Sequence, residues 1–277
     1  MIGVFDSGSG GITVLDALTK RLPDQDFLYL GDHANAPYGH RTSEQIVEMT
    51  KTSVDYLMRE GCSLVLLACN TAAAVALRTL QQNWLETAYP GNRILGVLVP
   101  MVEALTGVPW SQERPHADDN RNHRITLFAT RKTIESGAYV EEVLKRAPQI
   151  KLTGKACPGL VDAIEGGAGD APLSGLISGF VSETLETNPD AVVLGCTHFP
   201  LVKHYFETAL PDHVSLYSQP EIVADSLADY LKRHPHFHSK GQGNIRLLTT
   251  GDPKAVNKTN LFLPNHLNQF HQAKLNV

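Results

Sequence analysis

The sequence has few cysteines, no long apolar run and no excess of basic residues, and each shortage excludes a class of protein. Four cysteines in 277 residues, at positions 62, 69, 157 and 196, are too few and too scattered for a disulfide framework. The 24 Lys and Arg residues are outnumbered by 29 Asp and Glu, giving a net charge of −5. We therefore expect no nucleic-acid partner, because such proteins carry a basic patch or stripe.

Membrane insertion and secretion are also not expected. No segment reaches the roughly 18 consecutive apolar residues that span a bilayer. The start of the chain lacks the basic and apolar regions of a signal peptide. With 42% apolar and 19% charged residues, the composition is that of a globular chain. These features predict a soluble cytoplasmic protein with reduced thiols.

Short β-rich segments alternate with longer amphipathic segments, which is the pattern of strands and helices around a parallel sheet. The predicted strands are 2–5, 27–30, 64–68, 94–98, 125–129, 151–154, 191–194 and 245–248. The predicted helices include 43–59, 72–84, 134–145, 173–185 and 222–233. The sequence therefore predicts a layered α/β architecture.

Two places along the chain are predicted crossovers between domains. One lies beside the polar segment 110–124, which is expected to be a surface loop, and the other lies near Pro211. They predict a discontinuous first α/β domain, residues 1–96 plus 212–277, around a second one, residues 97–211. The tail from His234 shows one clear strand and is otherwise expected to be partly irregular.

Two predicted strands end in the same way, with a small residue, a cysteine and two small polar residues. Residues 64–71 are Leu-Val-Leu-Leu-Ala-Cys-Asn-Thr, and residues 191–198 are Ala-Val-Val-Leu-Gly-Cys-Thr-His. Ligands of open α/β sheets bind beyond the carboxyl ends of the strands, so Cys69 and Cys196 would face a binding crevice. A helix N-terminus beyond each thiol is expected to lower its pKa below the usual value of about 8.5.

Paired thiols suit one kind of reaction, the inversion of a carbon stereocentre. A base must remove the proton on one face while an acid delivers a proton on the other, and a cysteine can hold either state. A single cysteine after a strand is more often a small buried hydrophobe, which is our interpretation of Cys62 and Cys157. A zinc site built on Cys69, Cys196 and His198 lacks a fourth ligand at metal spacing, so no metal is expected.

Polar residues also follow two other predicted strands. Residues 6–11, Asp-Ser-Gly-Ser-Gly-Gly, lack the lysine of a phosphate-binding loop, and Asp6 would repel a phosphate. Ser7 and the glycine amides suit a carboxylate, whereas Asp6 suits an ammonium group or the tuning of a thiol. The alternative, a Gly-rich turn capping a helix, stays open from this motif alone. In residues 31–39, the amides of Tyr38 and Gly39 suit a side-chain carboxylate.

Several strings, in order along almost the whole chain, resemble those of glutamate racemases in the aspartate/glutamate racemase superfamily. They are Gly3-Val4-Phe5-Asp6-Ser7-Gly8, Gly31-Asp32 with Pro37-Tyr38-Gly39, Ala68-Cys69-Asn70-Thr71-Ala72, Ala129-Thr130 with Thr133 and Ser136-Gly137-Ala138-Tyr139, Cys157-Pro158 with Leu160-Val161 and Glu165, Leu194-Gly195-Cys196-Thr197-His198 with Pro200, and Thr249-Thr250-Gly251-Asp252.

The resemblance implies two pseudo-symmetric α/β domains with parallel-rich sheets, an active site at their interface, and no cofactor. It implies that Cys69 and Cys196 are the acid/base thiols, assisted by Asp6 and His198. Glutamate is the implied substrate, and the implied product role is D-glutamate for bacterial peptidoglycan. The implied binding residues are Ser7, Asp32, Tyr38, Gly39, Asn70, Thr71, Thr130, Thr133, Glu165 and Thr197.

Three segments depart from the family pattern. His33-Ala34-Asn35 replaces a common Thr-Ala-Arg, Arg131-Lys132 stands where less charged residues are usual, and Ser218-Gln219-Pro220 replaces a segment that often includes an aspartate. The alternatives are an aspartate racemase, a hydantoin racemase, a maleate isomerase, or a non-catalytic binder of small acids. No apolar stripe marks an interface, so the oligomeric state stays open, with a homodimer as one alternative.

Overall fold

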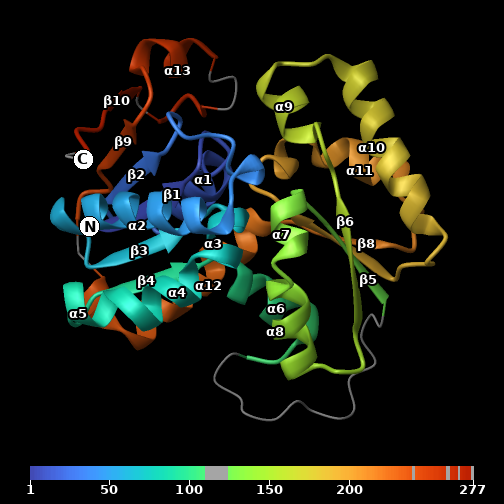
Figure 1. Cartoon of the computed structure of the whole chain (residues 1–277), viewed down its shortest axis with the longest axis horizontal. Coiled ribbons are helices and arrows are strands. Elements are labelled where there is room, and N and C mark those ends of the chain that lie inside the picture. The colour runs from blue at the N-terminus through green and yellow to red at the C-terminus, as the bar shows by residue number, and fades with distance from the viewer. Residues whose placement is uncertain (110–123, 239–240, 260–262, 268, 276–277) are drawn as a thin grey trace.

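Two parallel sheets lie side by side in the computed structural model, each covered by helices (Figure 1). The structure describes residues 1–109, 124–238, 241–259, 263–267 and 269–275. The first sheet has the strand order β10-β9-β2-β1-β3-β4, and the second has the order β6-β5-β7-β8. The predicted α/β class with parallel sheets is confirmed. Of the predicted loop 110–124, only Arg124 lies within the described residues, and it begins a strand.

The first sheet is built on strands that are buried on both faces. β1 (Ile2–Asp6) pairs with β2 (Phe27–Gly31) and β3 (Leu64–Leu67), and every residue of these three strands is buried. Continuous apolar runs of this kind are typical of parallel strands covered by helices on both sides. The covering helices include α1 (Ile12–Arg21), α2 (Ser43–Arg59) and α12 (Gln219–Arg233).

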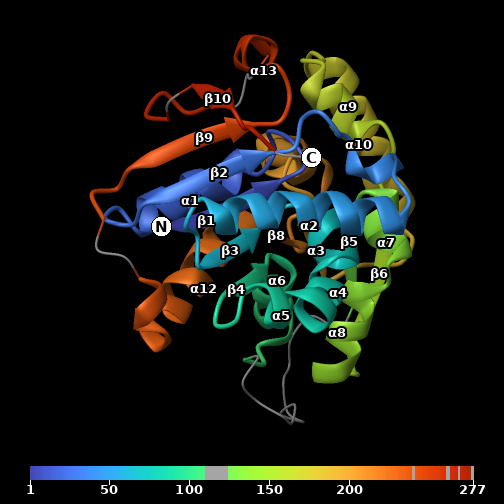
Figure 2. The same ribbon diagram turned by 60° about the vertical axis from the view of Figure 1, so that its left-hand side comes forward.

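Three further strands complete the first sheet, namely β4 (Arg93–Gly96), β9 (Ile245–Thr249) and β10 (Phe270–Gln272). The C-terminal strand β10 pairs in parallel with β9 and extends the sheet at that edge (Figure 2). The expectation of a single strand in the tail from His234 was therefore wrong. The missed strand has only three residues, two of them exposed, so it shows little apolar alternation.

The second sheet separates two apolar clusters. Its strands are β5 (Arg124–Ala129), β6 (Lys151–Ala156), β7 (Ala191–Gly195) and β8 (Ser215–Tyr217). Successive residues of β5 and β7 enter opposite clusters, because strand side chains alternate between the faces. One cluster includes α9 (Leu160–Glu165), α10 (Asp170–Leu185) and α11 (Lys203–Ala209), and the other includes α6 (Leu98–Thr106) and α8 (Ala138–Arg146).

The chain passes from the first sheet to the second after β4 and returns after β8. The buried face of α6 joins the second sheet's core, in line with a boundary near residue 97. β8 pairs with β7 in the second sheet, although residues 212–277 were assigned to the first domain. The strand pairing thus puts the return after Tyr217 rather than near Pro211. The sequence carries little indication of this strand, because β8 has only three residues and is only partly buried. The division into domains itself stays a prediction.

Two predicted helices are interrupted. The segment 134–145 is divided between α7 (Arg131–Glu135) and α8, because Gly137 between them has φ of +68°, a left-handed conformation that favours glycine. The segment 72–84 is divided into α3 (Asn70–Val75), α4 (Leu77–Leu80) and a π turn, η2 (Gln81–Leu85). The remaining short elements are α5 (Glu86–Ala88), α13 (Pro253–Thr259), η1 (Tyr38–His40), η3 (Phe199–Val202) and η4 (Pro235–Phe237).

Candidate active site

Both candidate thiols line one cavity of about 350 Å³, at the carboxyl ends of strands from both sheets. Ser7, Tyr38 and Cys69 follow β1, β2 and β3 of the first sheet, whereas the second sheet contributes residues after β5, β6 and β7. The helices α3 and α7, which begin beside this cavity, lie between the two sheets in Figure 1. Its volume lies within the range of small-molecule sites. The lining residues are Ser7, Pro37, Tyr38, Gly39, His40, Cys69, Asn70, Thr71, Thr130, Arg131, Cys157, Pro158, Gly159, Val161, Asp162, Cys196, Thr197 and His198.

The Cys69 thiol lies in an environment that favours its neutral form. Burial, followed by the nearby carboxylate of Asp6, raises the pKa of Cys69 to about 12, against smaller opposing contributions from Ser7 and the amide of Ala72. The Cys69 Sγ donates a hydrogen bond to Ser7 Oγ at 3.4 Å. The expected lowering of the Cys69 pKa was therefore wrong, because desolvation outweighs the field of the short helix α3 that begins beside it.

The Cys196 thiol has a basic neighbour instead. Cys196 Sγ lies 3.9 Å from His198 Nδ1, and His198 Nε2 lies 2.8 Å from Glu165 Oε1. Burial by itself lowers the pKa of His198, but its interactions with Cys196 and Glu165 outweigh burial and raise that pKa to about 10. Burial raises the pKa of Glu165, and the interactions with His198 more than reverse this, giving a net lowering. An imidazolium–carboxylate pair therefore stands behind Cys196 at neutral pH.

Asp6 lies behind the cavity rather than on its wall. This fully buried carboxylate accepts hydrogen bonds from the Gly8 amide at 2.9 Å and from Thr197 Oγ1 at 3.2 Å. Burial is the main reason that its pKa is raised. Of the two roles considered for Asp6, direct pairing with a substrate ammonium does not fit this position, whereas influence on Cys69 does.

The turn after β1 also brings the two sheets together. Thr13 Oγ1 donates a hydrogen bond to the carbonyl of Thr197 at 3.0 Å. A Cβ atom on Gly10 would lie 2.5 Å from both His198 Nδ1 and Thr197 Oγ1, closer than real contacts allow. Glycine at this position therefore permits the Gly-rich turn to approach the end of β7.

Asp32 orients a wall residue of the cavity without lining the cavity. Its buried carboxylate accepts hydrogen bonds from Tyr38 Oη at 2.6 Å, from Thr250 Oγ1 at 2.7 Å and from Asn35 Nδ2 at 3.0 Å. Burial, followed by this carboxylate, raises the pKa of Tyr38 far above its ordinary value, so Tyr38 is a neutral donor. Asp32, which the resemblance implied as a substrate-binding residue, thus supports Tyr38 from behind the cavity wall.

Three predicted threonines form a hydroxyl cluster across the cavity. Thr71 Oγ1 lies 3.0 Å from Thr130 Oγ1 and 3.2 Å from Thr133 Oγ1, within hydrogen-bond distance of both. Thr130 also caps α7 by accepting a hydrogen bond from the Thr133 amide. Thr71 and Thr130 line the cavity, whereas Thr133 lies behind them. The cluster ties the beginning of α3 to the beginning of α7.

The structure places most predicted site residues on the cavity wall and four behind it, namely Asp6, Asp32, Thr133 and Glu165. The sequence missed other wall residues: Pro37, His40, Arg131, Cys157, Pro158, Gly159, Val161 and Asp162. Cys157 follows the strand β6 much as Cys69 and Cys196 follow β3 and β7, but Pro158 and Gly159 stand where those two have small polar residues. Burial raises the pKa of Cys157 strongly, which keeps it a neutral thiol.

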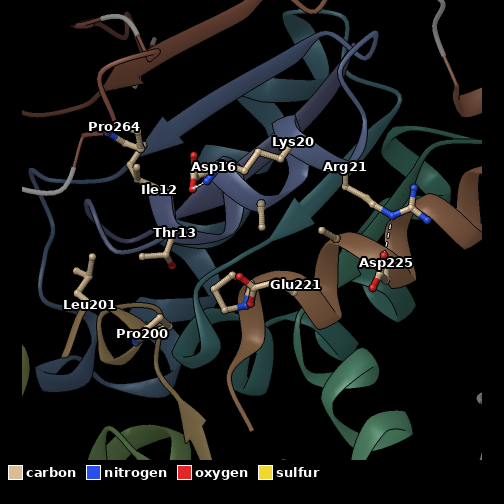
Figure 3. Close-up of a pocket in the computed structure, with 13 residues that line it drawn as sticks. Ile12, Thr13, Asp16, Lys20, Arg21, Pro200, Leu201, Glu221, Asp225 and Pro264 are labelled. Carbon is tan, nitrogen blue, oxygen red and sulfur yellow. Dashed lines mark hydrogen bonds and ion pairs between the residues drawn. The ribbon is translucent and has the colours of Figure 1, made fainter. Parts of the chain in front are cut away.

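A second hollow, of about 470 Å³, lies between α1, η3 and α12 (Figure 3). Four of its charged groups form two ion pairs: Arg21 Nε lies 2.6 Å from Asp225 Oδ1, and Lys20 Nζ lies 2.7 Å from Asp16 Oδ2. No cysteine and none of the predicted site residues line this hollow. The chemistry therefore belongs to the smaller cavity.

Two features are absent from the described part of the chain. Within the described ranges, no group of three or more His, Cys, Asp or Glu side chains is arranged to hold a metal ion. None of the described helices combines the length and apolarity that a membrane span requires.

Comparison with known proteins relates this chain to one family. The family model described as Asp/Glu/Hydantoin racemase matches residues 3–226. A glutamate racemase of Jannaschia sp. (strain CCS1) is 46% identical over 266 residues, which cover 95% of this chain and 96% of that protein.

Two solved structures are similar over nearly their whole length. Glutamate racemase isoform RacE1 from Bacillus anthracis superimposes with a TM-score of 0.86 at 26% identity, covering 99% of this chain and 97% of that one. The glutamate racemase from Francisella tularensis subsp. tularensis SCHU S4, in complex with D-glutamate, superimposes with a TM-score of 0.85 at 25% identity and the same coverage.

Proposed function

Because this chain belongs to the Asp/Glu/Hydantoin racemase family and is therefore an isomerase, we propose that it interconverts L- and D-glutamate by proton transfer between two thiols. The observation that carries this proposal is the presence of Cys69 and Cys196 on the wall of one cavity, each from a different sheet. The relatives named as glutamate racemases, one of them bound to D-glutamate, support glutamate as the substrate.

The proposed reaction needs one thiolate and one thiol. The cationic ring of His198 lies beside Cys196 Sγ and stabilises negative charge on that sulfur, whereas the surroundings of Cys69 favour the neutral thiol. One thiolate removes the α-proton, and the opposite thiol protonates the other face of the planar carbanion. The roles exchange for the reverse reaction, so each catalytic cycle leaves the thiols in swapped protonation states.

In this proposal, hydrogen-bond donors on the cavity wall bind and stabilise the negative charges of the substrate. Asn70, Thr71 and Thr197 stabilise the charge that develops as the α-proton leaves. The backbone amides of Tyr38 and Gly39 bind the side-chain carboxylate. Since the cavity lies between elements of both sheets, closure of the two halves on the substrate would exclude water from the carbanion.

The proposal extends to the physiological role and compartment. D-glutamate made by this enzyme would supply the synthesis of peptidoglycan. Buried, unpaired cysteines suit the reducing cytoplasm, where thiols persist without forming disulfides.

Circular dichroism of separate solutions of L-glutamate, D-glutamate, L-aspartate and D-aspartate tests which amino acid the protein racemises. Purified protein is expected to remove the optical activity of both glutamate enantiomers and to leave aspartate nearly unchanged. Loss of signal with aspartate alone would identify an aspartate racemase. Silence with all four solutions would contradict racemisation of these acids and favour a non-catalytic binder.

A further inference from the structure

Gln219 lies where the chain returns from the second sheet to the first, and it contacts the neighbour of a candidate catalytic thiol. It follows β8 and begins α12, and its side chain is fully buried. Its amide faces Asn70, which is 149 residues away in the sequence and directly follows Cys69. The segment 218–220 departs from the family pattern, and the proposed reaction assigns it no role.

The Asn70 and Gln219 side chains form a reciprocal amide pair. Asn70 Nδ2 donates to Gln219 Oε1 at 2.7 Å, and Gln219 Nε2 donates back to Asn70 Oδ1 at 2.8 Å. Tyr139 Oη donates to Asn70 Oδ1 at 2.8 Å and accepts a hydrogen bond from Gln219 Nε2 at 3.1 Å. The three side chains are buried, so each unmade hydrogen bond in this ring would carry a desolvation penalty.

In this arrangement the group that Asn70 presents to the cavity is an N–H. Asn70 Oδ1 already accepts two hydrogen bonds, which use both of its lone pairs. One of the two Nδ2 hydrogens is taken by Gln219, and the other remains for the cavity that Asn70 lines. With the amide reversed, the cavity would meet a carbonyl oxygen instead, which repels a carboxylate or a developing carbanion.

We propose that Gln219 is a positioning residue that holds the Asn70 amide with an N–H toward the substrate. The proposal rests on the proposed function, because it explains how Asn70, a donor of the same active site, is held in its orientation. Gln219 acts only through Asn70 and does not line the cavity itself. Tyr139, from α8 of the second core, adds a donor to the same oxygen and makes the orientation dependent on both halves of the molecule.

The first test is a double-mutant cycle on kcat/KM for glutamate with Gln219→Leu, Asn70→Ala and the combined variant. Gln219→Leu is expected to lower kcat/KM about 10- to 100-fold, the size of one hydrogen bond to a charged group. In the Asn70→Ala background the same change is expected to alter kcat/KM less than about threefold, because its target is absent. Equal losses in both backgrounds would overturn the proposal.

The second test is the pH dependence of the near-isosteric variant Gln219→Glu. A protonated carboxyl can accept from Asn70 Nδ2 and donate to Asn70 Oδ1, so it preserves the reciprocal pair, whereas an ionised carboxylate has no donor. The ratio of variant to wild-type kcat/KM is therefore expected to be near one at low pH and to fall as the pH rises. For Gln219→Leu that ratio stays low and flat. Equally flat ratios for both variants would overturn the proposal.

Two controls separate positioning from folding. Gln25→Leu removes another buried glutamine, at the end of the first sheet away from the cavity, and is expected to leave kcat/KM unchanged. Tyr139→Phe keeps the amide pair and is expected to cost less than Gln219→Leu. Should Gln219→Leu fail to fold, Gln219→Glu and Tyr139→Phe still decide the question.

The wild-type enzyme distinguishes this proposal from the proposed function. If the wild type racemises aspartate instead of glutamate, the substrate assignment fails and the cycle is run on aspartate with the same expectations. Silence of the wild type with both acids would overturn both proposals. An active wild type with additive losses would overturn only the role of Gln219.

Discussion

The Cys69 side of the cavity (Cys69, Ser7 and Asp6) and the Cys196 side (Cys196, His198 and Glu165) are alike in backbone but opposite in electrostatics. Each thiol stands at the carboxyl end of a buried parallel strand and is 5% exposed. On the Cys69 side, the thiol donates a hydrogen bond to the neutral hydroxyl of Ser7 and lies near the buried carboxylate of Asp6. On the Cys196 side, the thiol lies beside the cationic imidazole of His198, which is paired with the carboxylate of Glu165.

This difference shows that the strand ends determine where the thiols lie, whereas the side chains around each thiol determine its electrostatic environment. Ser7 comes from the turn after β1, far from Cys69 in the sequence, whereas His198 follows Cys196 by two residues and pairs with Glu165 from α9. The charged groups of the Cys196 side are the imidazolium of His198 and the carboxylate of Glu165. Four predictions test this asymmetry.

The largest effect is expected from removing either thiol. Cys69→Ser and Cys196→Ser should each lower kcat for racemisation about 10³-fold or more, because a hydroxyl is far less acidic than a thiol. Polarimetry of both glutamate enantiomers measures this loss. Cys62→Ser, a buried cysteine outside the cavity, is the matched control and should retain activity. Wild-type turnover in either cavity variant would eliminate the two-thiol mechanism.

A smaller loss, about 10²-fold in kcat/KM, is expected for His198→Asn, which removes the charge beside Cys196 but leaves a polar side chain. Because the equilibrium constant of racemisation is one, kcat/KM must fall equally in both directions. The asymmetry of the two sides should therefore appear as unequal changes in kcat for L- and D-glutamate. Equal changes in both kcat values would indicate that His198 serves the two thiols alike.

Glu165→Gln should act mainly at alkaline pH. In the wild type, Glu165 helps to raise the pKa of His198 to about 10, so the ring is cationic throughout the neutral range. Without the carboxylate that pKa falls, and activity should be lost at a lower pH as the pH rises, by about tenfold at the alkaline end. Profiles of kcat/KM against pH for the two proteins check this. Superimposable alkaline limbs would contradict the coupling.

The smallest effect is one on stability. The pKa of His198 is raised from about 6.5 in the unfolded chain to about 10 in the folded protein. Its protonation therefore contributes stability that is fully present below about pH 6.5 and is lost as the pH rises through about 10. The difference in unfolding free energy between wild type and His198→Asn should shrink over this window in urea titrations. A constant difference would show that the cation is not stabilised by folding.

The main residues of the site could be predicted from local sequence patterns. Apolar strands followed by polar residues predicted a shared site for Ser7, Tyr38, Cys69 and Cys196, because parallel strands share a carboxyl edge, and the family resemblance added Thr130. The helix break at Gly137 could not be predicted, since the apolar periodicity continues across it while one residue adopts a positive φ.

Other features depend on segments that meet only in the folded chain. The raised pKa of Cys69 follows from burial, to which distant segments contribute, and from Asp6, so the local helix terminus misled the prediction. The Asn70–Gln219 pair joins residues 149 positions apart and leaves no local pattern. Such contacts explain why the predicted residues were brought together but four of them proved to lie behind the cavity wall.

The most direct test of the two-thiol account is deuterium incorporation at the α-carbon in D₂O, followed by proton NMR early in the reaction. Starting from either glutamate enantiomer, the product should carry deuterium while the recovered substrate still carries protium. The reason is that one thiol removes the substrate's α-proton, whereas the other thiol, which has exchanged with D₂O, delivers a deuteron. A product that retains the substrate's own α-hydrogen would show that a single group transfers the proton, and would contradict the account.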